Sequence, residues 1–323
     1  MHFVPYDELS DLPNVVVDGA ANPHTLITLS HWPGSATPAA LRDDLSTQIV
    51  FRYLDSPELW VEAEAVSNNH FDEDGLVGIY SLVDPAEALP RRELLIDIAA
   101  AGDFGTYRFR EAARTAFVLS AFADPETSPL DRGIFRQRYM RLAATLYREL
   151  LQRLPEIIED LPGYRRYWES EDAMLADSEA MIREGRIQIQ EISELDLAVV
   201  TLPESLPGRK IHRFTLNRRA ACHPMALHNV ARSFRILLIQ GRTYELQYRY
   251  ESWVQYVSRT PLPRIDLAPL AERLSALESG RGRWVFDGVE EITPKLSLDG
   301  ADQSRIPPQE FVAQVKEFLS SQQ

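Results

Sequence analysis

The chain has 323 residues, enough for two domains or for one large domain with additions. Its 45% hydrophobic and 25% charged residues are typical of a globular protein and exclude a largely disordered one. A net charge of −14 disfavours binding to duplex nucleic acid or an anionic membrane, and no apolar stretch approaches the roughly 18 residues of a membrane helix. The N-terminus lacks signal-peptide features, and the single cysteine, Cys222, cannot form an internal disulfide. We therefore expect a cytoplasmic protein without a membrane partner.

The first hundred residues alternate between strand-like and helix-like segments. Runs rich in β-formers predict strands at 15–17 and 26–29, and the alternation of residues at 60–66 predicts a third. Helical spacing predicts one helix within 37–54 and the start of a short helix at 76–82, with an acidic loop at 68–75 before it. Residues 94–99 form another apolar run. Strands separated by helices favour a mostly parallel sheet covered on both faces.

The rest of the chain begins with a helical region and returns to strands. Residues 108–186 have a helical pattern, and 187–200 has strand character. Two runs, 234–239 and 243–250, flank Gly241-Arg242 and are typical of a β-hairpin. The remaining predicted elements are a helix at 267–277, a strand at 283–286 and a final helix at 310–319.

These elements predict an α/β protein with three parts. An N-terminal α/β domain with a mostly parallel sheet is expected at 1–110, and a helical segment packed on it at 111–186. A smaller α+β accessory domain is expected at 187–323.

The acidic loop after the predicted strand at 60–66 is the strongest candidate for a site. Its sequence is His70-Phe-Asp-Glu-Asp-Gly75, and ligands of open α/β folds bind at the carboxyl ends of the strands. Alternate residues of an extended segment point the same way, so His70, Asp72 and Asp74 can converge on one centre, while the glycine lets the backbone turn sharply away. Imidazole and carboxylates suit Mn²⁺, Fe²⁺, Zn²⁺ or Mg²⁺. The alternative is a solvated acidic turn that caps a helix.

At these residues the sequence resembles the DHH phosphoesterase superfamily, whose first motif is His/Asp-x-Asp-x-Asp-Gly after a strand. That superfamily hydrolyses phosphodiesters or phosphoanhydrides with two metal ions, often manganese. It has an aspartate-rich α/β domain followed by a smaller substrate-binding domain. The resemblance implies metal ligands at His70, Asp72 and Asp74, with Mn²⁺ as the first expectation.

Three further segments are similar to other motifs of the superfamily. The second motif, a strand ending in a bridging aspartate, is matched at Asp18, and the fourth motif, which supplies another aspartate, at Asp103. The Asp-His-His motif, whose middle residue is a ligand, is matched at His31, although Ser30 and Trp32 replace its outer members. The motifs occur in the order second, third, first, fourth. The alternatives are a strand-end turn for Asp18 and a packed histidine for His31.

Positive charge is concentrated in the accessory domain. The basic segment, Gly208–Arg264, has eleven lysines and arginines against two acidic residues. Such segregation can mark an anion site, and guanidinium groups such as those of Arg218 and Arg219 bind phosphate with two parallel hydrogen bonds. The superfamily often carries Gly-His-Pro near the substrate, so the resemblance adds His223, which precedes a proline here. The alternative is that these arginines pair with acidic helices elsewhere.

Together these features predict a metal-dependent phosphohydrolase that attacks a phosphodiester or phosphoanhydride with metal-activated water. Its partner would be a small phosphorylated ligand or a short oligonucleotide. The alternative, which the incomplete Asp-His-His motif favours, is a catalytically inactive metal- or anion-binding protein that retains part of the site. A third interpretation is a structural protein without a metal.

Overall fold

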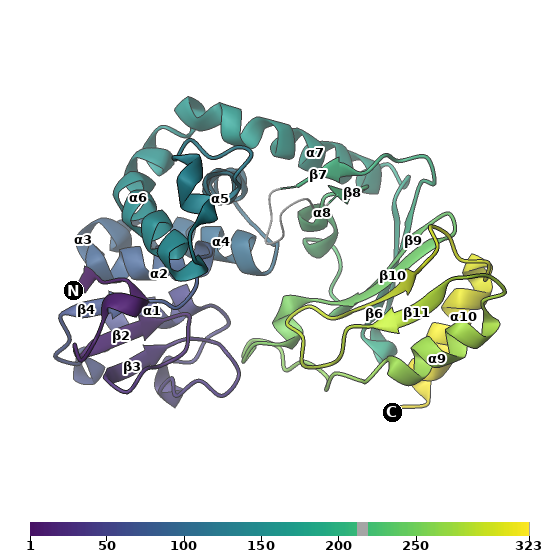
Figure 1. Ribbon diagram of the computed structural model, residues 1–323, viewed down its shortest axis with the longest axis horizontal. Helices are drawn as coiled ribbons and strands as arrows, with labels where there is room; N and C mark the ends of the chain where they lie inside the picture. Colours follow the sequence, from purple (N-terminus) through teal and green to yellow (C-terminus); the bar gives the residue numbers. More distant parts are fainter. Residues whose placement is uncertain (212–218, 323) are drawn as a thin grey trace. The chain divides into compact units, whose positions relative to one another are not determined.

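The computed structural model describes residues 1–211 and 219–322, which form an α/β protein of two compact units (Figure 1). Unit 1 comprises Met1–Met174, Val254–Arg259 and the described residues of Lys210–Arg219. Unit 2 comprises Leu175–Arg209, Ala220–Trp253 and the described residues of Thr260–Gln323. Within the described ranges, no helix has both the length and the apolar character needed to cross a membrane.

Unit 1 contains a four-stranded sheet in the order β1-β4-β2-β3, and every pairing in it is parallel. Its strands are β1 (His2–Phe3), β2 (Asn14–Val17), β3 (Thr25–Leu29) and β4 (Ala65–Ser67). The central strands β2 and β4 are buried along their whole length, as expected of strands covered on both faces. The prediction of a mostly parallel N-terminal sheet is confirmed.

The strand predicted at 60–66 is wrong for most of its length. Only its last two residues belong to β4, because the preceding segment bonds to helix α1 (Ser46–Leu54) instead of to the sheet. The Trp60 indole donates to the Tyr53 carbonyl at 2.8 Å, and the Val61 amide donates to the Tyr53 hydroxyl at 3.0 Å. Side-chain alternation therefore occurred here without strand pairing.

The helices of unit 1 pack on this sheet or on one another. They are α1, α2 (Glu73–Val83), α3 (Pro85–Ala88), α4 (Arg92–Asp103), α5 (Arg110–Ala123) and α6 (Tyr139–Glu159). α1 and α2 contact the strands, and α4 packs on α1 and α2. The apolar run at 94–99 lies in α4, where Leu95, Ile98 and Ala99 are fully buried. Helix α7 (Arg165–Arg183) begins in unit 1 and ends in unit 2.

Unit 2 contains a six-stranded mixed sheet in the order β11-β12-β10-β9-β6-β5, in which only the β6–β9 pairing is parallel. Its strands are β5 (Gln188–Ile192), β6 (Leu197–Leu202), β9 (Arg235–Gln240), β10 (Thr243–Tyr248), β11 (Arg283–Phe286) and β12 (Lys295–Asp299). The predicted hairpin is confirmed as β9–β10, with Gly241 at φ +56° in its turn. The predicted strand at 187–200 is divided into two antiparallel strands by a turn at Asp196, whose φ is also positive.

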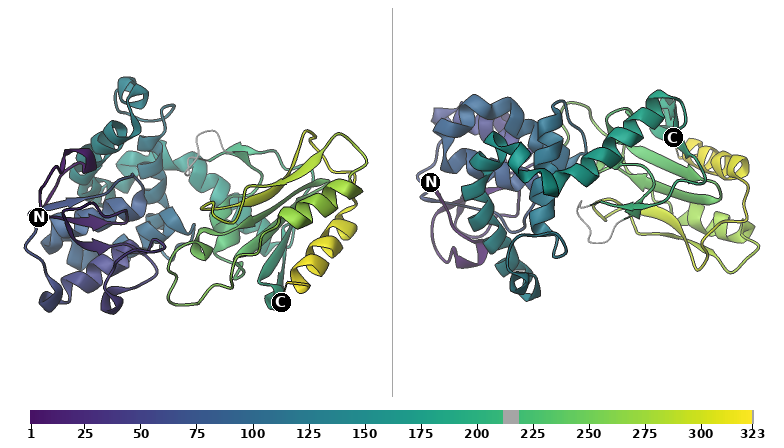
Figure 2. Two further views of the ribbon diagram at one scale, coloured as in Figure 1. Left: turned by 60° about the horizontal axis from the view of Figure 1, so that its bottom comes forward. Right: turned by 90° about the horizontal axis from the view of Figure 1, so that it is seen from above.

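Two helices form the core of unit 2 with this sheet. α9 (Ala268–Leu277) and α10 (Pro308–Ser320) lie side by side (Figure 2, left) and confirm the last two predicted helices. Their buried side chains, including Leu274 and Phe311, pack with Leu246 and Trp284 of the sheet. The remaining elements are the short helix α8 (Pro224–His228) and a two-stranded sheet of β7 (Arg209–Lys210) and β8 (Arg219–Ala220).

Candidate metal centre

Three neighbouring strands of the parallel sheet are followed by residues that can bind metal. Asp18 comes directly after β2, His31 lies two residues after β3, and His70 lies three residues after β4. Because parallel strands about 4.8 Å apart end at the same edge, their following residues can meet. The start of α2 contributes Asp72 and Asp74, and the last residue of α4 contributes Asp103. All six residues singled out in the sequence are brought together.

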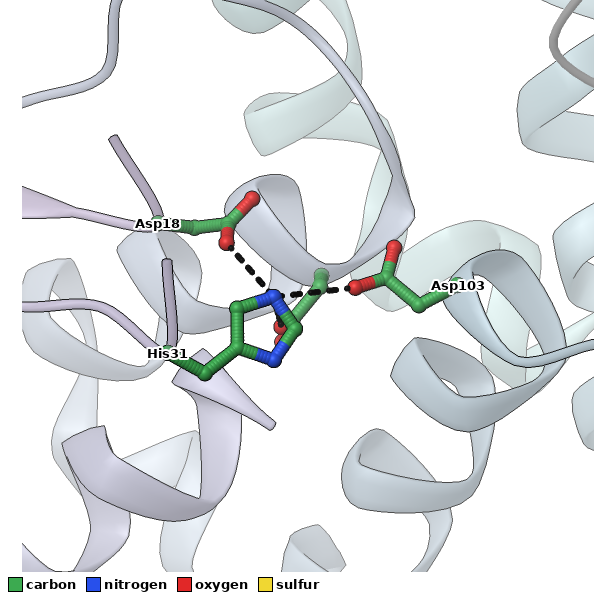
Figure 3. A group of neighbouring side chains, drawn as sticks. Asp18, His31 and Asp103 are labelled. Carbon is green, nitrogen blue, oxygen red and sulfur yellow. Dashed lines mark ion pairs between the residues drawn. The ribbon is translucent and has the colours of Figure 1, made fainter. Parts of the chain in front are cut away.

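Four of them form what we name the closed group: Asp18, His31, Asp74 and Asp103. The Nε2 atom of His31 lies 3.3 Å from Asp18 Oδ1, 3.4 Å from Asp103 Oδ2 and 3.9 Å from Asp74 Oδ2. Figure 3 shows the carboxylates of Asp18 and Asp103 directed at this nitrogen from two sides. All four residues are at most 2% exposed, so solvent does not screen their charges.

The second set, the open group, consists of Asp18, His70 and Asp72. The Nε2 atom of His70 lies 2.6 Å from Asp72 Oδ2 and 3.2 Å from Asp18 Oδ2. The side chains of His70 and Asp72 are 21% and 13% exposed, in contrast to the closed group. This set therefore has access to solvent.

Asp18 belongs to both groups, with Oδ1 toward His31 and Oδ2 toward His70. A carboxylate with its two oxygens in different ligand sets can bridge two cations, which in two-metal sites lie about 3.5–4 Å apart. Asp18 also has φ 49°, in the left-handed region that non-glycine residues seldom adopt. Such backbone strain clusters at functional sites.

The N-terminus of α1 orients the closed group. The amides of Ser46 and Thr47 each donate to the Asp74 carboxylate at 2.7 Å. The Ser46 hydroxyl donates to Asp18 Oδ1 at 2.7 Å and accepts from the His31 amide at 3.2 Å. One buried serine thus contacts three members of the group.

The His31 ring is fixed from its other nitrogen. His31 Nδ1 lies 2.5 Å from the backbone oxygen of Asp44, which can only accept a hydrogen bond. This contact places the Nδ1 proton toward Asp44 and leaves Nε2 to face the carboxylates, the usual arrangement of a metal-binding histidine.

Asp72 caps a helix and also lies in the cluster. It is the N-cap of α2, since its Oδ1 accepts from the Gly75 amide at 2.9 Å, and its Oδ2 faces His70. A helix cap and a place in the cluster are therefore compatible, because each oxygen serves one of them.

The predictions that Asp74 lies in one extended segment with His70 and that Gly75 makes a sharp turn are wrong. Both residues lie inside α2, so Asp74 does not share an extended segment with His70 and joins the closed group instead. Nor does Gly75 sit in a sharp turn. A Cβ there would lie 2.3 Å from Asn68 Nδ2 and 2.6 Å from the Tyr147 hydroxyl, so glycine lets these two buried side chains approach the helix closely.

Burial and mutual repulsion shift the ionisation of the cluster. Burial, followed by the charge of Asp18, raises the pKa of Asp74 to about 7. Burial would also raise the pKa of Asp18, but hydrogen bonds and charges from His31 and His70 lower it below its ordinary value. Burial opposes protonation of both histidines, yet neighbouring carboxylates raise the pKa of His31 and raise that of His70 further. The carboxylates thus hold protons in positions that a cation could take.

The predicted substrate-binding residues lie in the basic segment, far along the sequence from the clustered residues. Arg218 lies outside the described residues, and Arg219 is exposed in β8. His223 is 1% exposed and caps α8, with its Nδ1 accepting from the Met225 amide at 3.2 Å.

Several other cations of the basic segment already have partners. Lys210 contacts Asp124 at 2.7 Å, and Arg209 contacts Asp177 at 2.9 Å. Arg264 donates to the backbone oxygens of residues 289, 291 and 292. The ion pairs of Arg209 and Lys210 favour the alternative of cations paired with acidic residues for this part of the segment.

Ser46 and Asp44 were not predicted from the sequence as part of the site. Ser46 and Thr47 are typical residues of a helix start, and that preference could have moved the start of the helix predicted within 37–54 to this point. Asp44 acts partly through its backbone oxygen, for which side-chain chemistry gives no signal.

Comparison with known proteins gives a family but no activity. No curated protein and no solved structure matches the chain. A family model matches residues 1–323, and its description is a family of unknown function, DUF6687. The chain, with this acidic cluster in its N-terminal half, belongs to the DUF6687 family.

Proposed function

We propose that this protein is a metal-dependent phosphohydrolase that acts on a phosphodiester or phosphoanhydride. Two divalent cations, Mn²⁺ in the first instance, would occupy the closed and open groups and share Asp18. The observation that carries the proposal is the packing of four carboxylates and two imidazoles into two adjoining ligand sets. Divalent cations at such a site lower the pKa of water and offset charge on a phosphoryl group.

Charge balance supports a cation. Asp18, Asp72 and Asp74 form no ion pair with a lysine or arginine among the described residues, and Asp18 and Asp74 are fully buried. Burying a carboxylate without a counterion costs several kcal/mol, so buried charges are normally paired or bind metal. Two imidazoles provide at most part of that compensation.

The ligand chemistry and exposure support catalysis over a purely structural ion. Imidazole and carboxylate suit Mn²⁺, with Fe²⁺, Zn²⁺ and Mg²⁺ as alternatives. Structural metal sites are usually closed, whereas catalytic ones keep positions open to water and substrate. The open group has three residues and partial exposure, as a site with free coordination positions requires.

The resemblance to DHH phosphoesterases gives the reaction class. The four segments of this chain that resemble its motifs contain the six clustered residues, although the segments follow one another in a different order. Asp18, which resembles the bridging aspartate, is the residue shared by both groups. A small phosphorylated ligand or a short oligonucleotide is the substrate class we propose.

One observation favours the inactive alternative. Ser30 is fully buried, and its hydroxyl accepts from the Trp32 amide at 3.2 Å, while the Trp32 ring packs on His70 at 5.0 Å. Neither residue can transfer protons as the histidine and aspartate of the full Asp-His-His motif could. A binding protein that holds cations without turnover would have this arrangement.

Metal content and hydrolysis distinguish the two functions. Purified protein is stripped with chelator, reloaded with Mn²⁺ and assayed on pyrophosphate, bis-p-nitrophenyl phosphate and a short oligonucleotide. We expect two ions per chain, and their loss in Asp72→Asn/Asp74→Asn. The control is Asp97→Asn, which changes a buried carboxylate that accepts from the Arg108 and Phe109 amides outside the cluster.

Each result has a separate meaning. Metal binding with phosphate release supports the enzyme. Metal binding without turnover on any substrate supports the inactive alternative. Equal metal content in wild type and the double variant would overturn the site itself.

A further inference from the structure

A short segment from the last third of the chain lies beside the closed group. Val254–Arg259, which we name the strap, belongs to unit 1, although the residues on both sides of it in the sequence belong to unit 2. The strap is neither helix nor strand, so contacts with other segments must hold it in place.

One strap residue, Gln255, donates hydrogen bonds to the backbone at His31 and Trp32. The Gln255 amide donates to the His31 carbonyl at 2.7 Å. Its side-chain Nε2 donates to the Trp32 carbonyl at 3.0 Å. These two bonds fix consecutive peptide groups at the point where the chain leaves β3.

Asp44 connects the strap to the His31 ring. Its Oδ1 accepts from the Val257 and Ser258 amides at 2.6 and 2.9 Å. Its backbone oxygen is the atom that receives His31 Nδ1. The imidazole is therefore held by a residue whose side chain is bonded to the strap.

The strap also contacts the segment of a second member of the closed group. The Tyr256 ring meets the Phe104 ring edge to face, with centroids 5.4 Å apart. Phe104 directly follows Asp103, and its ring centroid lies 6.1 Å from that of His31. The strap thus borders the segments that carry two of the four closed-group residues.

We propose that the strap holds the closed group in its ion-binding geometry, with Asp44 and Gln255 as positioning residues. This inference rests on the proposed function, because it requires that the cluster bind a cation. Metal–ligand distances tolerate deviations of only a few tenths of an ångström. Substituting a residue that orients a ligand therefore lowers metal affinity by about 10–100-fold. His31 follows β3 in an irregular loop, so its position depends on such contacts.

The test is Mn²⁺ binding and release, measured without an activity assay. Asp44→Ala removes the carboxylate that holds the strap but keeps the backbone oxygen that receives His31. All variants are made in wild type and in His70→Ala, where loss of the open group leaves the closed-group ion to be measured alone. We expect Asp44→Ala to weaken that ion about tenfold and to speed its release to chelator.

Matched variants separate positioning from general damage. Asp44→Asn retains an oxygen acceptor and should restore most of the affinity. Gln255→Ala should weaken the same ion through loss of the Trp32 contact. Ser258→Ala should behave as wild type, because only the backbone amide of Ser258 bonds to Asp44. The open-group ion in the wild-type background should keep its affinity throughout.

The outcomes distinguish this inference from the proposed function. Unchanged affinity and release in both Asp44→Ala and Gln255→Ala would overturn the strap's role while leaving the metal site intact. Equal weakening of both ions, in proportion to a lower melting temperature, would also overturn it, since that pattern indicates destabilisation. A wild type that binds no Mn²⁺ would overturn the proposed function and this inference with it.

Discussion

Buried charge is treated differently in the two units. In unit 2, Arg249 and Glu251 are each 4% exposed and form an ion pair, and Arg249 also donates to the Ala231 carbonyl at 2.8 Å. Arg235, equally buried, donates to the Leu195 carbonyl and the Tyr248 hydroxyl. In unit 1, the buried carboxylates of the cluster face one another and two histidines.

The difference indicates which buried charges are structural. The charge of Arg249 is balanced by Glu251, and the guanidinium of Arg235 donates to neutral oxygens of its own unit. The cluster has an excess of negative charge that its imidazoles do not balance, and an added cation would complete it. The two regions therefore differ in whether a counter-cation is lacking, whereas the sequence indicated the first by its motifs and the basic segment by its charge.

The largest loss of metal binding is expected when the shared aspartate, Asp18, is changed. Asp18→Asn should reduce Mn²⁺ affinity by more than about a hundredfold at both groups, because each oxygen of Asp18 faces a different group. Mn²⁺ titration of chelator-stripped protein measures this. His70→Ala is the matched comparison and should lose only the open-group ion. Retention of either ion at wild-type affinity in Asp18→Asn would show that Asp18 does not bridge.

The corresponding change in unit 2 should affect stability alone. Arg249→Ala leaves Glu251 buried without its cation, which typically costs about 3–5 kcal/mol of unfolding free energy. Urea unfolding gives the loss, and metal analysis should still find the wild-type number of ions. Arg249→Ala combined with Glu251→Gln should recover part of the stability. If Arg249→Ala lost Mn²⁺ at a temperature where it is still folded, the buried ion pair of unit 2 and the metal cluster of unit 1 would not be independent.

The pH dependence of stability tests whether the clustered carboxylates of unit 1 hold protons in place of a cation. The pKa of Asp74 is raised from 3.8 to about 7, so the folded cluster binds this proton more tightly than the unfolded chain. Its stabilising effect is complete below pH 3.8 and is lost as pH rises through about 7. The raised pKa of His31 and of His70 acts with the same sign at higher pH.

We therefore expect the melting temperature of chelator-stripped protein to fall as pH rises from about 4 to 7. Mn²⁺ affinity should rise over the same range, because the cation displaces protons. Asp74→Asn, which has no proton to lose, should flatten the change in melting temperature. A melting curve that is independent of pH in wild type and variant alike would contradict this charge imbalance.

The smallest expected effect comes from the residue that supports the closed group. Ser46→Ala removes the hydroxyl that donates to Asp18 and should weaken the closed-group ion about tenfold. Ser81→Ala is the control, since Ser81 is as buried but donates to the Val77 carbonyl on α2. Isothermal titration with Mn²⁺ compares them. Equal affinities in the two variants would remove Ser46 from the support of the site.

Much of the framework followed from local patterns in the sequence. β-Branched runs bounded by turns predicted β2 and β3, and the two runs around Gly241 predicted the β9–β10 hairpin, because these signals depend on neighbouring residues alone. The six clustered residues were also identified from short motifs. Parallel strands end at one edge, so the meeting of Asp18, His31 and His70 could be inferred from order along the chain.

Only the tertiary structure decided how the six residues divide into two groups. Asp74 belongs to the closed group and not to the open group of His70 and Asp72, because it lies in the first turn of α2 and its carboxylate faces the amides of α1. The strap joined the site from more than two hundred residues away, mainly through the backbone amides of Gln255, Val257 and Ser258. Side-chain types and their spacing are written in the sequence, whereas the partners of backbone groups are set by which segments the folded chain brings together.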